Sequence, residues 1–323
     1  MSERRRILSI DGGGVRGIIP ATVLAKLEET TRKKTREHFD FLTGTSTGAV
    51  IAGALAVGIP AQKLVTLYER RGRELFRKIW GLSLLKRFFL GHMYSVDQLN
   101  RMLSEELEGH AEVHLNALDN DIMITAKGLL DGHAWYFVKD RIGEGPGKTG
   151  ELLLTDCVTA SAAAPTYFAP WTINDIGVLV DGGTGVAGNP VYQACVEAFE
   201  YIKTYKPAET VVVSLGTGRY LERTPPTWLP SWLTWILSEL LRSPGEQQTE
   251  LVKRHYRSAK FYRIDAALKR DFQLDSIGEL EELRRVGSEL AKGVNWKAIL
   301  AGQDDESRIV PKKVQARDYA RAV

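Results

Sequence analysis

Residues 39–53 of the chain read FDFLTGTSTGAVIAG, and this stretch decides which class of fold the sequence can adopt. An apolar run typical of a buried strand passes through a glycine- and threonine-rich turn into an Ala/Gly-rich helical pattern. The turn, Gly44-Thr45-Ser46-Thr47-Gly48, has the form G-x-S-x-G, in which a sharp strand-to-helix connection exposes a serine hydroxyl. Helix N-terminal amides would favour negative charge developing beside this serine. The stretch therefore predicts a nucleophile, Ser46, with an incidental Gly/Ser/Thr loop as the alternative.

A second glycine-rich turn lies near the start of the chain, in RRRILSIDGGGVRGIIPATVL at residues 4–24. Its spacing also satisfies G-x-G-x-x-G, the pattern of a dinucleotide-binding turn, which expects an acidic residue about 20 positions further on at the end of the second strand. Glu37 and Asp40 fall near that distance, but they precede the second strand. Three consecutive glycines, Gly12 to Gly14, leave backbone amides bare and accessible, as in an oxyanion hole. We therefore favour an oxyanion hole over a dinucleotide-binding oxidoreductase.

The third glycine-rich turn belongs to IGVLVDGGTGVAGNP at residues 176–190. Asp181 ends a Val/Leu-rich strand pattern and precedes Gly182 and Gly183. Such a carboxylate often hydrogen-bonds its own turn, but it can also be the general base that a serine nucleophile needs. A triad in the order Ser–Asp–His would require His255, which lies among basic residues on what looks like a solvated helix. The sequence favours a two-residue arrangement of Ser46 and Asp181.

Composition is ordinary for a globular protein. The 323 residues are 44% hydrophobic and 26% charged, which is enough for a sizeable core. The net charge of +3 is too balanced to argue for a nucleic-acid partner. The two cysteines, Cys157 and Cys195, lie in buried helical patterns, which fits a reducing compartment. Because neither a signal peptide nor a spanning segment is visible, we expect a soluble, cytoplasmic protein.

Strand and helix patterns alternate along the chain, which predicts an α/β fold with a mainly parallel central sheet. We expect one domain over residues 1–323, with insertions at 70–91 and 224–245 that face a membrane or form a lid. The expected strands are RILSID, FDFLTG, NDIMITAK, HAWYFVKD, IGVLVDGG, ETVVVSLGTG and KFYRID; the expected helices are Ile18–Thr35, Thr47–Val57, Ser95–Leu107, Thr155–Ala163, Val191–Lys203 and Ser276–Ala291.

The three turns together resemble the motifs of the patatin-like phospholipases, bacterial members in particular. DGGGVRG at 11–17 is similar to the oxyanion motif D-G-G-G-x-R-G, GTSTG at 44–48 to G-x-S-x-G, and DGG at 181–183 to D-G-[GA]. ASAAAPTYFAP before Asp181 and GNPVYQA after it also resemble the family. The likeness spans roughly residues 5 to 220, and nothing after Pro225 identifies a subgroup.

The resemblance implies a three-layer α/β/α sandwich and a Ser–Asp dyad that hydrolyses acyl esters of lipids through an acyl-enzyme, as a phospholipase A, esterase or lipase. It implies no cofactor and no metal, calcium included. It assigns Ser46 and Asp181 to catalysis. The implied oxyanion hole uses the amides of Gly13, Gly14 and Thr47, with Gly12 shaping the loop. The implied supporting residues are Arg16, Gly44, Gly48, Gly182 and Gly183.

Two segments suggest how a lipid reaches such a site. Trp228, Trp232 and Trp235 recur at helical spacing, and tryptophan favours the membrane–water interface. Core packing or a dimer contact explains this stripe equally well. The basic and apolar residues of 70–91 suit an anionic lipid surface, or a solvated helix covering the core. The partners that we expect are a lipid ester and a peripheral membrane surface, with the oligomeric state open.

Two other functions stay open at this stage. An acyltransferase would share the acyl-enzyme but pass the acyl group to an alcohol, and sequence cannot separate it from a hydrolase because water exclusion decides between them. A non-enzymatic storage or interaction protein on the same scaffold is less favoured, because both Ser46 and Asp181 are present.

Overall fold

Parallel strands form the centre of the main β-sheet. The structure, a computed structural model, describes residues 4–75, 92–107, 109–140, 149–185, 188–220, 227–228, 232 and 244–303. Across the sheet, neighbouring strands follow the order β9 (Lys260–Ile264), β7 (Thr210–Leu215), β1 (Arg5–Ile10), β2 (Phe41–Gly44) and β3 (Asp121–Gly128), each parallel to the next. The expectation of a mainly parallel sheet is confirmed.

Strand β3 carries three partners, and their registers matter for the site. Its whole central stretch pairs antiparallel with β4 (Ala134–Val138) on one edge. On the other edge, the first half of β3 pairs with β2 and the second half pairs antiparallel with β6 (Gly177–Asp181). Strands β2 and β6 therefore approach each other end to end along the same edge of β3. Strand β5 (Trp171–Ile173) pairs with β6.

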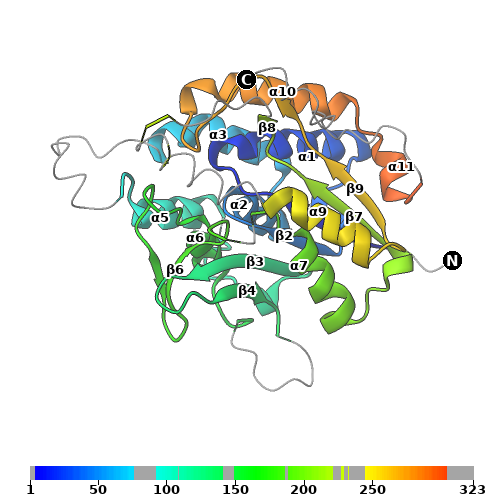
Figure 1. Cartoon of the computed structure of the whole chain (residues 1–323), viewed down its shortest axis with the longest axis horizontal. Coiled ribbons are helices and arrows are strands. Elements are labelled where there is room, and N and C mark those ends of the chain that lie inside the picture. Colours follow the sequence, from blue (N-terminus) through cyan, green and yellow to red (C-terminus); the bar gives the residue numbers. More distant parts are fainter. Residues whose placement is uncertain are drawn as a thin grey trace.

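Helices cover both faces of the sheet and give a three-layer α/β/α sandwich, as expected (Figure 1). The larger cluster of buried side chains joins one face of the sheet to α1, α2, α3, α5, α6, α10 and α11. The bounds of these helices are Ile18–Thr31, Thr47–Ala56, Ala61–Leu75, Val96–Glu106, Leu154–Ala162, Leu280–Lys292 and Trp296–Leu300. The opposite face is covered by α7 (Val191–Val196), the π-helical turn Glu197–Ile202 and α9 (Pro244–His255).

Smaller elements complete the described part of the fold. Strands β8 (Arg219–Tyr220) and β10 (Ala267–Leu268) form a separate two-stranded sheet. The 3-10 turns span Gly14–Gly17, Thr35–Glu37, Leu115–Ala117, Pro207–Glu209 and Ile277–Glu279.

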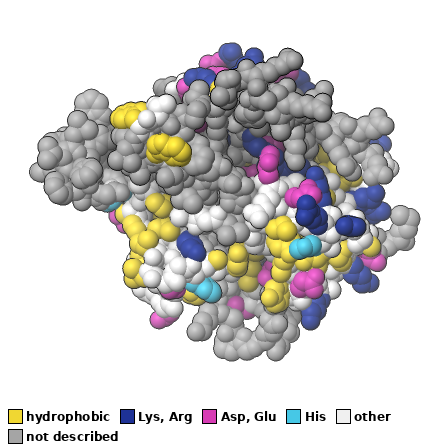
Figure 2. Space-filling view, in the orientation of Figure 1, with side chains coloured by type: hydrophobic (Ala, Val, Ile, Leu, Met, Phe, Trp, Pro, Cys, Tyr) yellow, Lys and Arg dark blue, Asp and Glu magenta, His cyan; other side chains and the backbone are white. Residues whose placement is uncertain are grey.

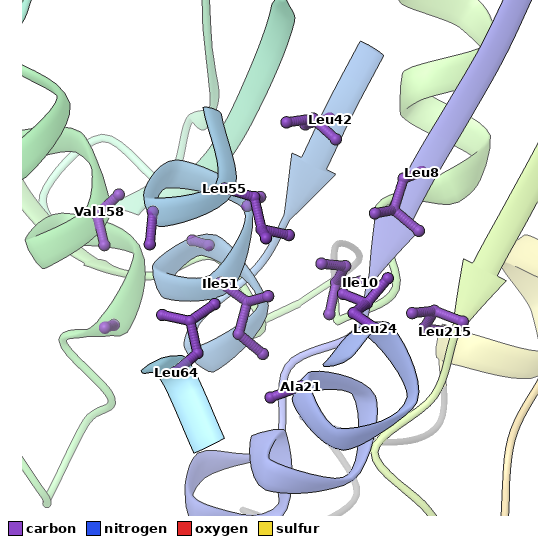
Figure 3. Packing of buried hydrophobic residues seen from close by; sticks show 14 of the residues in the cluster. Leu8, Ile10, Ala21, Leu24, Leu42, Ile51, Leu55, Leu64, Val158 and Leu215 are labelled. Atoms are coloured by element: carbon purple, nitrogen blue, oxygen red, sulfur yellow. The ribbon is translucent and has the colours of Figure 1, made fainter. Parts of the chain in front are cut away.

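Strand alternation explains why both faces are apolar. Ile7 and Leu8 are consecutive and fully buried, and they belong to the clusters on opposite faces of the sheet. A parallel sheet covered on both sides requires near-continuous apolar strands of this kind. On the larger side, Leu8 and Ile10 point from β1 toward Leu24 of α1 and Ile51 of α2, which sets α2 firmly against the sheet (Figure 3).

The expected elements match the structure except at some ends. The first helix ends at Thr31 instead of Thr35. Arg32 follows in a left-handed conformation, and its amide donates a hydrogen bond to the Glu28 carbonyl, which ends the helix. The expected helix Val191–Lys203 turns π-helical at Glu197, which periodicity cannot reveal. Helices α3 and α11 and strands β5, β8 and β10 were not expected. Most of the insertions 70–91 and 224–245 lies outside the described residues.

Candidate active site

A sharp turn between β2 and α2 holds Ser46. Its φ of 56° and ψ of −124° are rare for a residue with a side chain. The flanking glycines allow this turn, since a Cβ on Gly44 would lie 2.1 Å from the Gly48 carbonyl oxygen and one on Gly48 would lie 2.2 Å from the Ile10 oxygen. The tight packing of strand, turn and helix thus fixes where the Ser46 hydroxyl points.

Polar groups below the turn hold its backbone. The Ser46 amide donates to the Ser161 hydroxyl over 2.9 Å, and Ser161 is fully buried near the end of α6. The Thr45 and Thr125 hydroxyls lie 2.7 Å apart and link the turn to β3. Strained backbone conformations persist when surrounding contacts over-determine them. These hydrogen bonds supply that support, and sequence analysis did not single out Ser161, Thr45 or Thr125.

Asp181, the last residue of β6, faces Ser46. The register pairs Asp181 with Ala126 of β3, two positions beyond the Ile124 that pairs with Gly44. Because β2 and β6 meet end to end here, the Ser46 hydroxyl lies close enough to the Asp181 carboxyl to act on its pKa. The Gly183 amide donates to this carboxyl, over 2.7 Å. Gly182 backs onto β3, where an added Cβ would lie 2.3 Å from the Thr125 hydroxyl.

The Asp181 carboxyl has an unusual pKa. Burial raises this pKa from 3.8 to about 6, and the hydrogen bonds from Ser46 and Gly183 oppose the rise. The side chain is only 1% exposed. A carboxylate of this basicity suits proton transfer near neutral pH.

The glycine loop after β1 passes directly beside Ser46. An added Cβ on Gly12 would lie 3.3 Å from the Ser46 Cβ. The Gly12 amide is engaged, because it donates to the Gly188 carbonyl over 2.9 Å. Within the described part of the chain, the amides of Gly13, Gly14 and Thr47 donate no hydrogen bond. These three amides are therefore available as hydrogen-bond donors at the glycine loop and at the start of α2. The Gly12 amide is not available, because it is already bonded to Gly188.

Arg16 secures this loop from inside the protein. Its side chain is 3% exposed, its Nε donates to the Gly13 carbonyl, and its Nη1 donates to the Gly218 carbonyl, both over 3.2 Å. The Thr217 hydroxyl donates to the Gly12 carbonyl over 2.8 Å. With these carbonyls occupied on one side of the loop, the free amides are held in a fixed direction.

A buried ion-pair network anchors the start of the same loop. The Arg263 guanidinium donates to both carboxyl oxygens of Asp11, over 2.8 and 2.6 Å, and to Asp265 over 2.9 Å. Asp265 also accepts from Arg219 over 2.7 Å. Although burial would raise the pKa of Asp265, the two guanidinium groups hold it below its usual value. No sequence motif marks these residues. They come together only because β9 pairs with β7, which in turn pairs with β1.

An apolar cavity adjoins Ser46. Helices α2, α3, α5 and α6 contribute most of its walls. Its lining includes Val50, Leu67, Leu99, Met102, Leu103 and Phe168. Tyr68 reaches into it and hydrogen-bonds the Thr47 hydroxyl, and burial raises the pKa of Tyr68. The cavity suits a hydrocarbon chain whose polar end lies at Ser46.

Other residues named from sequence lie elsewhere. Trp228 and Trp232 are 64% and 46% exposed, so neither is a core residue, and Trp235 lies outside the described residues. His255 ends α9, where its Nδ1 lies 2.7 Å from the Tyr192 hydroxyl. Within the described ranges, no group of three or more His, Cys, Asp or Glu side chains could hold a metal ion. No described helix is long and apolar enough to span a bilayer.

Comparisons with known proteins identify similar sequences. A family model described as Patatin-like phospholipase matches residues 8–195. The chain is 32% identical over 227 residues to a cGAMP-activated phospholipase of Escherichia coli (strain TW11681), covering 66% of this chain and 62% of that protein. A cGAMP-activated phospholipase of Pseudomonas aeruginosa is 28% identical, and the alignment covers 88% of this chain and 87% of that protein. Patatin group J-1 of Solanum tuberosum is 28% identical, and the alignment covers 74% of this chain and 68% of that protein. The matched region thus spans less than two thirds of the first relative.

Proposed function

The chain belongs to the patatin-like phospholipase family, and we propose from this premise that it hydrolyses carboxylic esters of lipids with Ser46 as nucleophile and Asp181 as general base. The proximity of these two side chains, at the meeting ends of β2 and β6 and beside an apolar cavity, supports the proposal. A serine hydroxyl is a weak nucleophile unless an adjacent base takes its proton. Asp181 is the base that contacts this hydroxyl.

The first half of the reaction acylates the enzyme. Ser46 Oγ attacks the ester carbonyl carbon while Asp181 takes the hydroxyl proton. The carbonyl oxygen becomes an oxyanion, which accepts hydrogen bonds from the amides of Gly13, Gly14 and Thr47. When the tetrahedral intermediate collapses, the C–O bond to the alcohol breaks. The proton held by Asp181 passes to the departing alcohol oxygen, which leaves an ester between the acyl group and Ser46.

The second half releases the acid. Asp181, again a carboxylate, takes a proton from water as the water oxygen attacks the acyl-enzyme carbonyl. The same amides receive the new oxyanion. Collapse returns the electron pair to Ser46 Oγ, which regains its proton from Asp181, and the free carboxylic acid departs. An alcohol in place of water would make the reaction a transfer, so product analysis with and without glycerol distinguishes the two outcomes.

Phospholipid ester hydrolysis by wild type, Ser46→Ala and Asp181→Asn tests the proposal. Both variants should lose about a thousandfold or more in kcat, because nucleophile and base act as one unit. His255→Ala is the matched control and should keep its activity, since this exposed side chain pairs with Tyr192. Because two relatives are named cGAMP-activated phospholipases, each assay is run with and without cGAMP. An active Asp181→Asn beside an inactive His255→Ala would refute the dyad.

We also propose that the protein works at a lipid surface. Exposed large apolar side chains support this: Trp228, Trp232, and Leu129 and Leu130 in the turn between β3 and β4, which are 49% and 83% exposed. In Figure 2, hydrophobic side chains gather on the side where α5 and β6 lie, whereas most Lys and Arg side chains in that view lie toward the N-terminus. Large apolar side chains exposed in this way occur at interaction surfaces.

A further inference from the structure

A second, smaller apolar cavity lies between the same four helices, farther from Ser46. It is lined by α2, α3, α5 and α6, as is most of the cavity beside Ser46. Its apolar walls include Gly53, Ala54, Leu64, Leu107, Leu154 and Val158. None of the residues assigned above to catalysis contacts it, so the proposed chemistry leaves this space unexplained.

Three side chains belong to the walls of both cavities and separate them. Val50 comes from α2, Leu67 from α3 and Leu103 from α5. On each helix, the residues on one side of this partition line the first cavity and those on the other side line the second. With a rise of 1.5 Å per residue, Val50 lies about 6 Å along α2 from Ser46 and Ala54 about 12 Å. The two cavities therefore succeed one another along a line leading away from Ser46.

The far end of the second cavity does not offer unpaired polar groups. Thr155 donates its hydroxyl proton to the Ala111 carbonyl over 3.1 Å, and Glu106 accepts from Arg71 Nε over 3.1 Å. Lys63 has a partner of its own. A polar ligand would gain nothing by entering, whereas an apolar chain would bury surface against leucine and valine side chains.

Gly53 keeps this space open. A Cβ at this position would lie 3.0 Å from Val158 Cγ2 and 3.4 Å from Leu154 Cδ1. Even one added methyl group would therefore press on the opposite wall, which belongs to α6. Glycine weakens the interior of a helix relative to alanine, and here it preserves room between α2 and α6.

We propose that the second cavity holds the distal end of long acyl chains, and that Val50, Leu67 and Leu103 form the partition that such chains must pass. This inference rests on the proposed function, because it takes the acyl group to be attached at Ser46. Short chains end within the first cavity. Longer chains displace the partition and bury their last methylene groups beyond it, so the two cavities set chain-length preference.

Two variants test the proposal in opposite directions. Ala54→Leu fills the second cavity, and Val158→Ala enlarges it. Rates are measured on nitrophenyl butanoate, octanoate and palmitate in detergent. We expect Ala54→Leu to lower the palmitate-to-butanoate ratio of kcat/KM about tenfold or more, and Val158→Ala to raise it, because single methylene groups discriminate on this scale in apolar pockets. Val50→Ala, which widens the partition, should also raise the ratio.

Ile51→Val is the matched control. Ile51 is fully buried on α2 but lines neither cavity, so this change perturbs the core without altering the path of the chain. The control should leave the ratio at the wild-type value. The inference fails if Ala54→Leu changes all three esters equally, or if Ile51→Val shifts the ratio as much. Ser46→Ala tests the proposed function separately. If Ser46→Ala loses activity while the cavity variants keep the wild-type palmitate-to-butanoate ratio, only the chain-length inference is refuted.

Discussion

Burial raises the pKa of the Asp181 carboxyl, and the Ser46 hydroxyl beside it opposes that rise. The two side chains reach this point from strands that end head to head along one edge of β3. In the proposed mechanism a buried carboxylate takes the place that histidine holds in many serine hydrolases. Its protonation state is then expected to affect both the activity and the stability of the protein.

The rate on a soluble ester should depend on pH through Asp181. The general base must be ionised, and its pKa is about 6. We expect kcat/KM to be flat above about pH 7 and to fall about tenfold per unit well below pH 6. A pH–rate profile with nitrophenyl butanoate measures this. Activity that persists undiminished to about pH 4 would contradict the assignment, as would an acidic limb that disappears in His255→Ala.

Asp181→Asn should make the folded protein more stable at neutral pH. The pKa of the native carboxyl lies above its ordinary value of 3.8, so ionisation opposes folding. This cost is absent below about pH 4, grows up to about pH 6 and is complete above it. Allowing for weakened hydrogen bonds, we expect a gain of about 1–3 kcal/mol at pH 8 and none at pH 4. Urea unfolding at both pH values measures it; equal effects at the two would exclude this origin.

Breaking the Asp11–Arg263 pair should destabilise the fold and impair the reaction together. Arg263→Gln leaves a buried carboxylate short of its counter-charge, which costs about 3–5 kcal/mol. Asp11 also begins the glycine loop, so we expect kcat to fall more than KM rises. Denaturant unfolding and steady-state kinetics test this, with exposed Arg285→Gln as the control for loss of a surface arginine. In a double-mutant cycle, fully additive effects of Asp11→Asn and Arg263→Gln would show that the pair is not coupled.

Replacing both Trp228 and Trp232 by serine should weaken activity on phospholipid vesicles while the rate on a soluble ester changes little. Exposed indole rings gain free energy at a membrane–water interface and have no such role toward a dissolved substrate. The readout is the vesicle-to-soluble rate ratio, together with vesicle sedimentation. Tyr201→Ser removes another exposed aromatic side chain and serves as the control. Equal losses on both substrates would argue against a docking role.

The sequence sufficed to predict the fold class and the three glycine turns, because local spacing encodes them. G-x-S-x-G between a strand and a helix describes a single tight turn. Gly44 is required there by a contact with Gly48 in the same turn, and Gly48 by a contact with Ile10 of β1. Asp181 was marked by its position at the end of a strand followed by two glycines. The contact between Asp181 and Ser46, by contrast, depends on the register of β6 on β3, and no local pattern encodes that register.

The supporting residues could not be predicted for the same reason. Ser161 supports Ser46 from another helix, and Arg263 reaches Asp11 from β9, two strands away from β1 in the sheet. In sequence, both look like ordinary residues of a helix and a strand. The divided cavity was equally hidden, since Val50, Leu67 and Leu103 resemble core residues until the helices that carry them are packed together.

The dependence of the site on both β6 and β9 has a consequence for the synthesis of the protein. A ribosome delivers the serine turn and the glycine loop early, the carboxylate of Asp181 much later, and the guanidinium that anchors Asp11 later still. On the proposed mechanism, a partly translated chain carries the nucleophile without its base. Lipid-ester hydrolysis is then expected only after β9 has emerged, because Arg263 on that strand anchors Asp11.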